Sequence, residues 1–296
     1  MKQVKVLGIP FSHGQKHKGV SLAPDLLRQE GLISRISSWI PCRDEGDISL
    51  PLKDKDCSES NFLISQKILS LDLKDSFLLN IGGDHGMALG TIHGILEKSP
   101  DSIIIWADAH GDINTPDSSL TGNFHGMPLA YLIGLVEKEK NFSWIKNHLD
   151  PRKLIYFGPR DLDEEEKKII SRLNITYFSS KEINQKGAFN LLDKAIREID
   201  PHDLYPIHLS FDVDILDPAE ISATGTRVEE GPRLEEVQDM LIYLAQTQRL
   251  NSMDVVELNP ELGSDLECKQ SVSLVLELII LTLRHSVSRR SAAHSA

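Results

Sequence analysis

Short runs of apolar residues alternate along the chain with longer segments in which apolar residues recur at helical spacing. The short runs have the length of buried strands, and the segments between them predict helices. Expected strands lie at residues 4–9, 77–81, 102–107, 153–157, 175–178, 207–211 and 253–260. Expected helices lie at 21–36, 61–71, 88–97, 126–135, 187–199, 233–246 and 267–285, with a further helix that starts at 164. This alternation predicts an α/β fold of three layers, α/β/α, around a mostly parallel central sheet.

The 296 residues contain no internal repeat, low-complexity segment or linker, so we expect a single domain over residues 1–296. Ser21 is placed to cap the first helix, and Pro24 falls in its first turn, where a missing amide costs little. Residues 44–57 are charged and interrupted by a proline, and we expect them to be irregular. The small and polar residues 286–296 are expected to fray.

Two carboxylates and an imidazole follow the apolar run at 103–105 at alternate positions, as Asp108, His110 and Asp112. Alternate side chains of an extended chain point the same way, so these three converge if the strand end stays extended. Carboxylates brought together repel one another and resist desolvation unless a cation lies between them. The pattern therefore predicts a divalent metal site, although a strand that ends in a polar, solvated loop would show the same pattern.

Two further strands end in side chains of the same kind. His85 follows the strand at 77–81, and Asp212 and Asp214 follow the strand at 207–211. In parallel α/β sheets, sites gather at the carboxyl ends of the strands, beside the switch point. We therefore expect all six side chains to meet at one edge of the sheet.

Four carboxylates and two imidazoles exceed the needs of one ion and suit two divalent cations. Oxygen-rich ligation with added imidazoles favours Mn²⁺ over Mg²⁺ or Zn²⁺. Two such ions hold a hydroxide nucleophile at neutral pH and stabilise an oxyanion, which is the equipment of a hydrolase. A purely structural metal, the alternative, is usually saturated by tight protein ligands.

Charge and cysteine content narrow the class of protein. The formal net charge is -12 and the sequence pI is about 5.4, which argues against a nucleic-acid partner. Three widely spaced cysteines form neither a disulfide framework nor a zinc motif, so we expect a reducing, cytoplasmic setting. The longest apolar run, residues 272–283, is too short and too polar to span a bilayer, and we see no signal peptide and expect no membrane partner.

Three stretches together resemble the ureohydrolases, also called the arginase family. They are Gly82-Gly83-Asp84-His85, Asp108-Ala109-His110-Gly111-Asp112 and Ser210-Phe211-Asp212-Val213-Asp214. Supporting stretches are 10–15, 114–116, 121–126, 223–226 and 257–260, and the resemblance runs from about residue 6 to about residue 283. It implies hydrolysis of L-arginine to L-ornithine and urea, through attack of a metal-bridging hydroxide on the guanidinium carbon.

The resemblance also implies a role for each ligand. One Mn²⁺ ion would be held by His85, Asp108, Asp112 and Asp212, and the other by His110, Asp108, Asp212 and Asp214. Asp108 and Asp212 would bridge the two ions. Asp112 would in addition accept a hydrogen bond from the hydroxide and orient it.

Catalytic and substrate-binding positions follow by the same resemblance. His125 matches the proton shuttle to the leaving amine, and Glu257 matches the acid that pairs with the guanidinium group. The contacts of the substrate's α-carboxylate match Asn114, Thr121 and Asn123, and His110 is also expected among the substrate-binding residues. Asp163 matches the acid that binds the α-amino group, with Glu166 beside it, and Thr226 matches a threonine next to the guanidinium group. An alternative explanation of Asp163 and Glu166 is that acidic residues are favourable in the first turn of a solvated helix.

Three features depart from the usual pattern of that family. Gly86 stands where a serine often follows the histidine, and Ile215 stands where glycine is expected. A charged segment, 227–233, replaces one usually built of proline, valine and glycine. Two other functions therefore stay open: hydrolysis of another guanidino compound such as agmatine, and a non-catalytic metal-binding relative. The resemblance further implies a homotrimer or a homohexamer.

Overall fold

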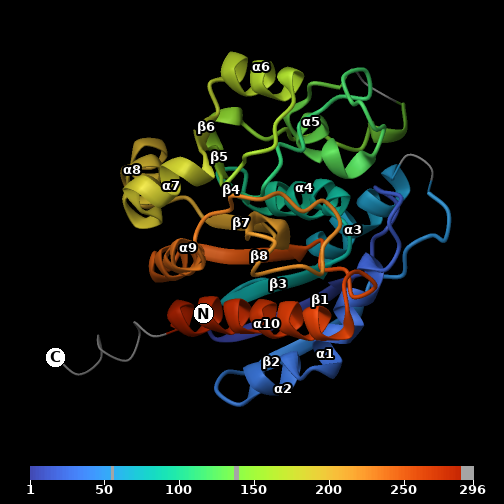
Figure 1. Ribbon diagram of the computed structural model, residues 1–296, viewed down its shortest axis with the longest axis vertical. Coiled ribbons are helices and arrows are strands. Elements are labelled where there is room, and N and C mark those ends of the chain that lie inside the picture. Colours follow the sequence, from blue (N-terminus) through green and yellow to red (C-terminus); the bar gives the residue numbers. More distant parts are fainter. Residues whose placement is uncertain (55–56, 137–139, 288–296) are drawn as a thin grey trace.

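One parallel sheet of eight strands lies at the centre of the residues that the structure, a computed structural model, describes: 1–54, 57–136 and 140–287 (Figure 1). The strand order is β2-β1-β3-β8-β7-β4-β5-β6, and every neighbouring pair is parallel. The strands are β1 (Gln3–Ile9), β2 (Cys42–Asp47), β3 (Ser76–Gly82), β4 (Ile103–Ala107), β5 (Leu154–Phe157), β6 (Thr176–Phe178), β7 (Ile207–Asp212) and β8 (Leu250–Val256).

Helices cover both faces of the sheet and complete three layers. One face packs against α1 (Ala23–Gln29), α2 (Leu32–Ser37), α7 (Ser180–Lys186), α8 (Ala188–Ile199), α9 (Leu234–Gln246) and α10 (Asp265–Val287). The other face packs against α3 (Ser58–Ser70), α4 (Ala88–Lys98), α5 (Pro128–Ile133) and α6 (Glu164–Leu173). In Figure 1 the sheet rises through the molecule from β2 at the bottom to β6 at the top.

Strand β4 shows how the sequence builds the two cores. Ile103 and Ile105 belong to one buried cluster, whereas Ile104 and Trp106 belong to the other. Successive side chains of a strand point to opposite faces, so a continuous apolar run is what a strand covered on both faces requires. The predicted α/β/α fold is therefore confirmed, and the sheet is wholly parallel.

Some expected boundaries were wrong. Residues 42–47 form β2 instead of an irregular segment, and Glu45 in that strand forms an ion pair with Lys5 of β1 at 3.4 Å. The expected helix at 21–36 is divided into α1 and α2, because Gly31 adopts a left-handed conformation (φ 90°). Ser21 makes no side-chain cap there. Helix α10 continues through Ser286 and Val287, and the rest of the expected frayed tail lies outside the described residues.

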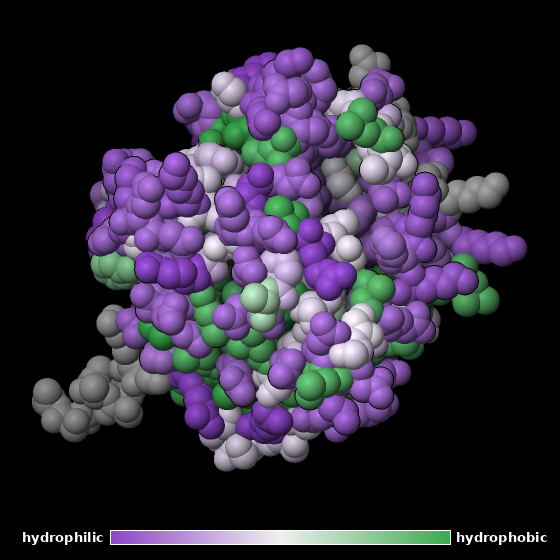
Figure 2. Space-filling view, viewed as in Figure 1, coloured by the Kyte–Doolittle hydropathy of each residue, from purple (hydrophilic) through white to green (hydrophobic). Residues whose placement is uncertain are grey.

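Figure 2 shows a mostly hydrophilic face, with apolar side chains gathered mainly over its lower half, where α10 lies. Among the described residues, no helix combines the length and the apolar character that a bilayer crossing needs.

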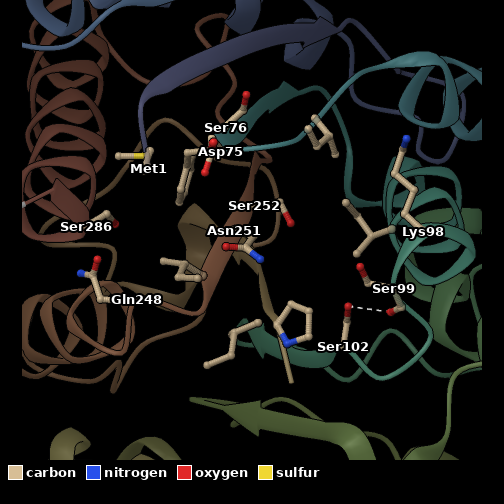
Figure 3. Close-up of a pocket in the computed structure, with 16 residues that line it drawn as sticks. Met1, Asp75, Ser76, Lys98, Ser99, Ser102, Gln248, Asn251, Ser252 and Ser286 are labelled. Atoms are coloured by element: carbon tan, nitrogen blue, oxygen red, sulfur yellow. Dashed lines mark hydrogen bonds between the residues drawn. The ribbon is translucent and has the colours of Figure 1, made fainter. Parts of the chain in front are cut away.

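A hollow of about 380 Å³ opens at the amino ends of the central strands (Figure 3). Its lining includes Ser76 at the start of β3, Ser252 near the start of β8 and Ser286 near the end of α10. The Ser252 hydroxyl is hydrogen-bonded to Nδ1 of the buried His208 at 2.8 Å. None of the predicted metal ligands lines this hollow, so the predicted chemistry belongs to the opposite edge of the sheet.

Candidate metal centre and catalytic site

Four adjacent strands in the middle of the sheet, β3, β8, β7 and β4, carry the predicted site at their carboxyl ends. His85 begins a short 3₁₀ turn after β3, and Glu257 directly follows β8. Asp212 ends β7, and Asp108 directly follows β4. The chain inserts β7 and β8 between β3 and β4, so segments more than 100 residues apart meet at this edge.

The first cluster of ligand atoms surrounds the imidazole of His85. Its Nδ1 lies 2.9 Å from Oδ2 of Asp108, 3.2 Å from Oδ2 of Asp112 and 3.3 Å from Oδ2 of Asp212. The side chains of His85 and Asp108 are each only 1 % exposed. Three carboxylate oxygens around one buried ring nitrogen is the arrangement expected of ligands that share a cation.

Two neighbours hold the His85 ring in this orientation. Nε2 lies 2.8 Å from the Ser210 hydroxyl, and the ring stacks on Trp106 with a centroid separation of 3.9 Å and an interplanar angle of 6°. When Nε2 donates its proton to Ser210, the lone pair of Nδ1 faces the carboxylates. An outer partner that fixes the tautomer in this way is typical of a metal-binding histidine.

The second cluster surrounds Nδ1 of His110, which lies 3.3 Å from Oδ1 of Asp108 and 3.2 Å from Oδ2 of Asp214. The Asp214 carboxylate is oriented by Ala109, whose backbone N–H donates to Oδ1 at 3.2 Å, and by Thr226, whose hydroxyl donates to Oδ2 at 3.1 Å. Asp108 belongs to both clusters, with a different oxygen turned to each imidazole.

The buried carboxylates of the two clusters place enough negative charge in one region to favour the binding of cations. Burial opposes protonation of both imidazoles, yet the surrounding carboxylates raise the pKa of His85 and of His110 well above the ordinary value. Burial and the Asp108 charge raise the pKa of Asp112 to about 6. Buried carboxylates that resist ionisation together, beside imidazoles drawn toward the charged form, indicate a site made for positive charge.

The structure brings all six predicted ligands together, but not by the route expected for three of them. Strand β4 ends at Ala107, and Asp112 has a φ of 48°, in the left-handed region. The chain therefore turns after the strand instead of staying extended. Glu257 is also left-handed (φ 65°), and such non-glycine residues are held in place by their surroundings and concentrate at functional sites.

These residues fit two divalent cations. Each cluster offers oxygen and imidazole ligands, Nδ1 of His85 has no hydrogen-bond partner among the described residues although it is buried, and one carboxylate is shared. No cysteine takes part. Hard oxygen ligands with two imidazoles favour an ion such as Mn²⁺ over Zn²⁺ held by thiolates.

His125 and Glu257 form a pair beside the clusters. Nδ1 of His125 lies 3.1 Å from Oε1 of Glu257, and this oxygen also accepts the backbone N–H of His85 at 2.9 Å. Burial lowers the pKa of His125, but Glu257 outweighs this effect and raises it to about 9. The imidazole is therefore protonated at neutral pH, with Nε2 left to donate.

The polar side of the site opens into a hollow of about 340 Å³. Its lining contains residues of both clusters, His125 and all the predicted substrate-binding residues except Glu257. These substrate-binding residues are His110, Asn114, Thr121, Asn123, Asp163, Glu166 and Thr226. Asp161 also lies at this hollow and is exposed, so carboxylates line the approach to the clusters.

Asp163 and Glu166 serve helix α6 as well as lining the hollow. Oδ1 of Asp163 accepts the backbone N–H of Glu166, and Oε2 of Glu166 accepts the N–H of Asp163, which is a capping box. The other oxygen of Asp163 accepts from the Asn114 amide at 2.8 Å. Burial raises the pKa of Glu166 to about 8. Asp163 and Glu166 therefore cap the amino end of α6, as the alternative explanation of these acids predicted.

Neighbours of Gly86 and Ile215 explain two of the sequence departures. A Cβ on Gly86 would lie 2.8 Å from Oδ1 of Asp84 and 2.9 Å from the Phe124 ring, so a serine has no room there. Ile215 is fully buried in the core and fills the space beside Gly158, where a Cβ would lie only 2.8 Å from it. The larger residue at 215 is thus matched by a glycine opposite.

Three residues that contact the site were not predicted from the sequence: Ser210, Gln15 and Arg160. Each of them lies at or near the carboxyl end of a strand. Ser210 lies within the strand motif and orients His85, and Gln15 in the loop after β1 donates from Nε2 to Oε2 of Glu257 at 2.5 Å. Arg160 follows β5 directly after Gly158 and Pro159, and its side chain reaches the loop of Asp214. A polar side chain at a strand end in such a sheet is a signal of function even where its partner is distant in sequence.

Known proteins of the arginase family are similar to this protein over nearly its whole length. A family model described as the arginase family matches residues 2–282. Arginase-2, mitochondrial, of Rattus norvegicus is 36% identical over an alignment of 295 positions, and the alignment covers 93% of this chain and 83% of that protein. The crystal structure of the arginase of Bacillus subtilis superposes with a TM-score of 0.86 at 30% identity and covers 95% of this chain and 98% of that one.

A further solved relative was crystallised with a ligand. The arginase of Entamoeba histolytica, in complex with L-ornithine, has a TM-score of 0.86 and 30% identity, with coverage of 95% of this chain and 97% of that chain. The family match, the identity to curated arginases and the two ligand clusters agree. The chain belongs to the arginase family, whose fold the sequence predicted.

Proposed function

We propose that the protein is an arginase, which hydrolyses L-arginine to L-ornithine and urea with two Mn²⁺ ions. The observation that carries the proposal is the pair of ligand clusters that share Asp108, next to the His125–Glu257 pair and beneath an acidic hollow. Relatives named arginase, one of them solved with L-ornithine, support this substrate.

Each residue of the site has a task in this reaction. The ions, when bound, would lower the pKa of water, so that hydroxide is available at neutral pH, and would stabilise the charge on the oxygen that attacks the guanidinium carbon. His85, Asp108, Asp112 and Asp212 would hold one ion, and His110, Asp108, Asp212 and Asp214 the other. The oxygens of Asp108 already face the two clusters separately, which supports a bridging role for this residue.

His125 would deliver the proton that the leaving amine needs. Its Nδ1 is engaged by Glu257, so the proton transferred is the one on Nε2. Oε1 of Glu257 already accepts from His85 and His125, whereas Oε2 accepts only from Gln15 and keeps a lone pair, with which it would accept an N–H group of a guanidinium ion. The charge of Glu257 would thus stabilise both the substrate's guanidinium group and the protonated His125.

The acidic hollow favours a cationic substrate. Asp161, Asp163 and Glu166 line it, and a cleft with charge of one sign attracts ligands of the other sign. Asn114, Thr121 and Asn123 would receive the α-carboxylate of arginine, which agmatine lacks. The backbone N–H of Asn123 already donates a hydrogen bond to the Thr121 hydroxyl oxygen at 3.1 Å, which shapes the loop that carries these contacts.

A guanidino compound without the carboxylate is the second candidate substrate. One observation favours it: Oδ1 of Asp163 accepts two backbone N–H groups of α6 and Oδ2 already accepts the Asn114 amide, so the amino-acid clamp would have to share its groups. The third possibility, a relative without catalysis, would not need the His125–Glu257 pair.

Urea release from the Mn²⁺-loaded protein, with L-arginine and agmatine offered side by side, tests the proposal. Urea from L-arginine alone supports it. Urea from agmatine alone overturns the substrate assignment and leaves the metal chemistry. No urea from either compound, with both ions bound, overturns hydrolysis of both candidates and favours the relative without catalysis.

A further inference from the structure

Arg160 makes an unusual set of contacts behind the second ligand cluster. Its guanidinium group makes six hydrogen bonds, and every acceptor is a backbone carbonyl. Among the ion pairs of the described residues none involves Arg160. A guanidinium group presents five N–H donors in a rigid fork, so a set of carbonyls around it is fixed in geometry as well as satisfied.

Five of the six acceptors belong to two separate loops of the site, and the sixth is the Gly158 carbonyl, two residues before Arg160 itself. NH2 donates to Asp214 at 2.9 Å and to Leu216 at 3.2 Å, and NH1 donates to Ile215 at 3.1 Å. On the other side, NH2 donates to Val228 at 2.8 Å and Nε donates to Glu229 at 3.0 Å. One side chain therefore joins the loop after β7 to the charged segment that follows Thr226.

The backbone of Arg160 reaches a third segment. Its N–H donates to the carbonyl of Ala109 at 2.9 Å, and the N–H of Ala109 donates to Oδ1 of Asp214 at 3.2 Å. Ala109 stands between Asp108 and His110, the other members of the second cluster. All three segments that build this cluster are thus connected through Arg160, whereas within the described part of the chain no hydrogen bond of Arg160 reaches His85 or Asp212.

We infer that Arg160 is a positioning residue for the second ion: its fork sets the distance between the Asp214 loop and the Thr226 segment, and with it the affinity of the Asp108–His110–Asp214 cluster. The Thr226 hydroxyl donates to the same Asp214 oxygen that faces His110, so a shift between the two loops moves a ligand atom directly. This inference rests on the proposed two-ion site and deepens it.

The fork, and not the charge alone, is what the geometry requires. A lysine at 160 keeps the charge but offers a point group with three donors, which cannot reach acceptors on both loops in one plane. Arg160→Lys and Arg160→Gln should therefore both weaken the second ion, Arg160→Gln more strongly. Such a result separates positioning from simple charge balance.

Arg249 offers a matched control in another part of the molecule. It is also largely buried, with a side chain 10% exposed, and pairs with Asp200 at 2.6 Å and with Asp203 at 3.2 Å. Arg249→Gln removes a comparable guanidinium group without touching any segment of the metal centre. A loss of stability without a change in the metal constants is expected of this variant.

Calorimetric titration of the metal-free full chain with Mn²⁺ gives the two stepwise dissociation constants for each variant. We expect one of the two constants, that of the Asp108–His110–Asp214 cluster, to rise about 10-fold or more in Arg160→Gln, as an energy change of about 1.4 kcal/mol implies, with the other constant changed less than about 3-fold. Thermal unfolding of the same samples shows whether a variant is folded. If Arg160→Gln does not fold, Arg160→Lys carries the comparison.

The possible results distinguish this inference from the proposed function. Two constants equal to those of the wild type in either Arg160 variant overturn the inference and leave the two-ion site. An equal weakening of both constants, with a loss of stability like that of Arg249→Gln, also overturns it. A wild-type chain that binds only one ion overturns the two-ion proposal, and the inference with it.

Discussion

Oδ2 of Asp108 lies 2.9 Å from Nδ1 of His85, while the second oxygen of the same carboxylate faces the opposite side of the metal centre. A carboxylate in this position couples the two ions. Loss of Asp108 should therefore affect both clusters at once, unlike loss of a ligand that belongs to one cluster.

Asp108→Asn should reduce bound Mn²⁺ to less than one ion per chain. The amide keeps the size of the side chain but loses the charge, and kcat/KM should fall about 1,000-fold or more, as a loss of several kcal/mol of metal stabilisation implies. Elemental analysis after gel filtration, with a urea assay, measures both effects. Asp161→Asn is the control for metal content, because its exposed carboxylate lies 4.0 Å from His110 and in neither cluster. Full metal content in Asp108→Asn would refute the bridging role.

His125→Asn should keep both ions and lower turnover by about 100-fold, the usual contribution of a general acid. Among the described residues, His125 forms an ion pair with Glu257 and none with the carboxylates of the two clusters, so metal content should not change. Turnover under saturating substrate and metal analysis on the same sample check this. An unchanged turnover number would mean that another group or water delivers the proton.

The His125–Glu257 pair should also make stability depend on pH. The folded pKa of His125, about 9, lies above the unfolded value of about 6.5. Its contribution is therefore fully present below about pH 6.5 and is lost as the pH rises through about 9. In chelator-treated protein, His125→Asn should cost on the order of 2 kcal/mol at about pH 6 and much less at about pH 10. Urea unfolding at both pH values measures the difference, and an equal cost at both would contradict the assigned shift.

Ile215→Ala should destabilise the fold without emptying the metal centre. The side chain is fully buried beside Gly158, so truncation leaves a cavity and should cost about 2–5 kcal/mol. The carbonyl of residue 215 still accepts from Arg160, so two ions should bind as before. Denaturant unfolding with metal analysis tests this, and loss of the ions in a folded Ile215→Ala chain would show that the side chain positions Asp214.

The ends of the central strands could be predicted because their chemistry is local in sequence. The spacing of Asp108, His110 and Asp112 pointed to three candidate ligands, and two further strand ends supplied the other three candidates, since parallel strands bring their carboxyl ends together. What the spacing could not give is the turn at Asp112. A left-handed residue after a strand depends on contacts such as the Leu129 N–H, which donates to the Asp112 carbonyl from a distant segment.

Edge strand β2 and the Arg160 contacts escaped prediction for related reasons. The charges of β2 are neutralised by residues far away in sequence, such as Arg28, which pairs with Asp47 at 2.6 Å. Every residue has a backbone carbonyl, so the sequence does not show which carbonyls accept hydrogen bonds from Arg160. Its six partners can be identified only from the structure. Apolar periodicity identifies buried strands, whereas these features depend on tertiary contacts.

The most direct test of the account counts ions and urea in the same sample. Metal-free protein is titrated with Mn²⁺, and the rate of urea formation from L-arginine is measured against the number of ions bound per chain. The account predicts that full activity requires the second ion, because both clusters share Asp108 and act together. Full activity with a single ion, or no urea from L-arginine with two ions bound, would contradict it.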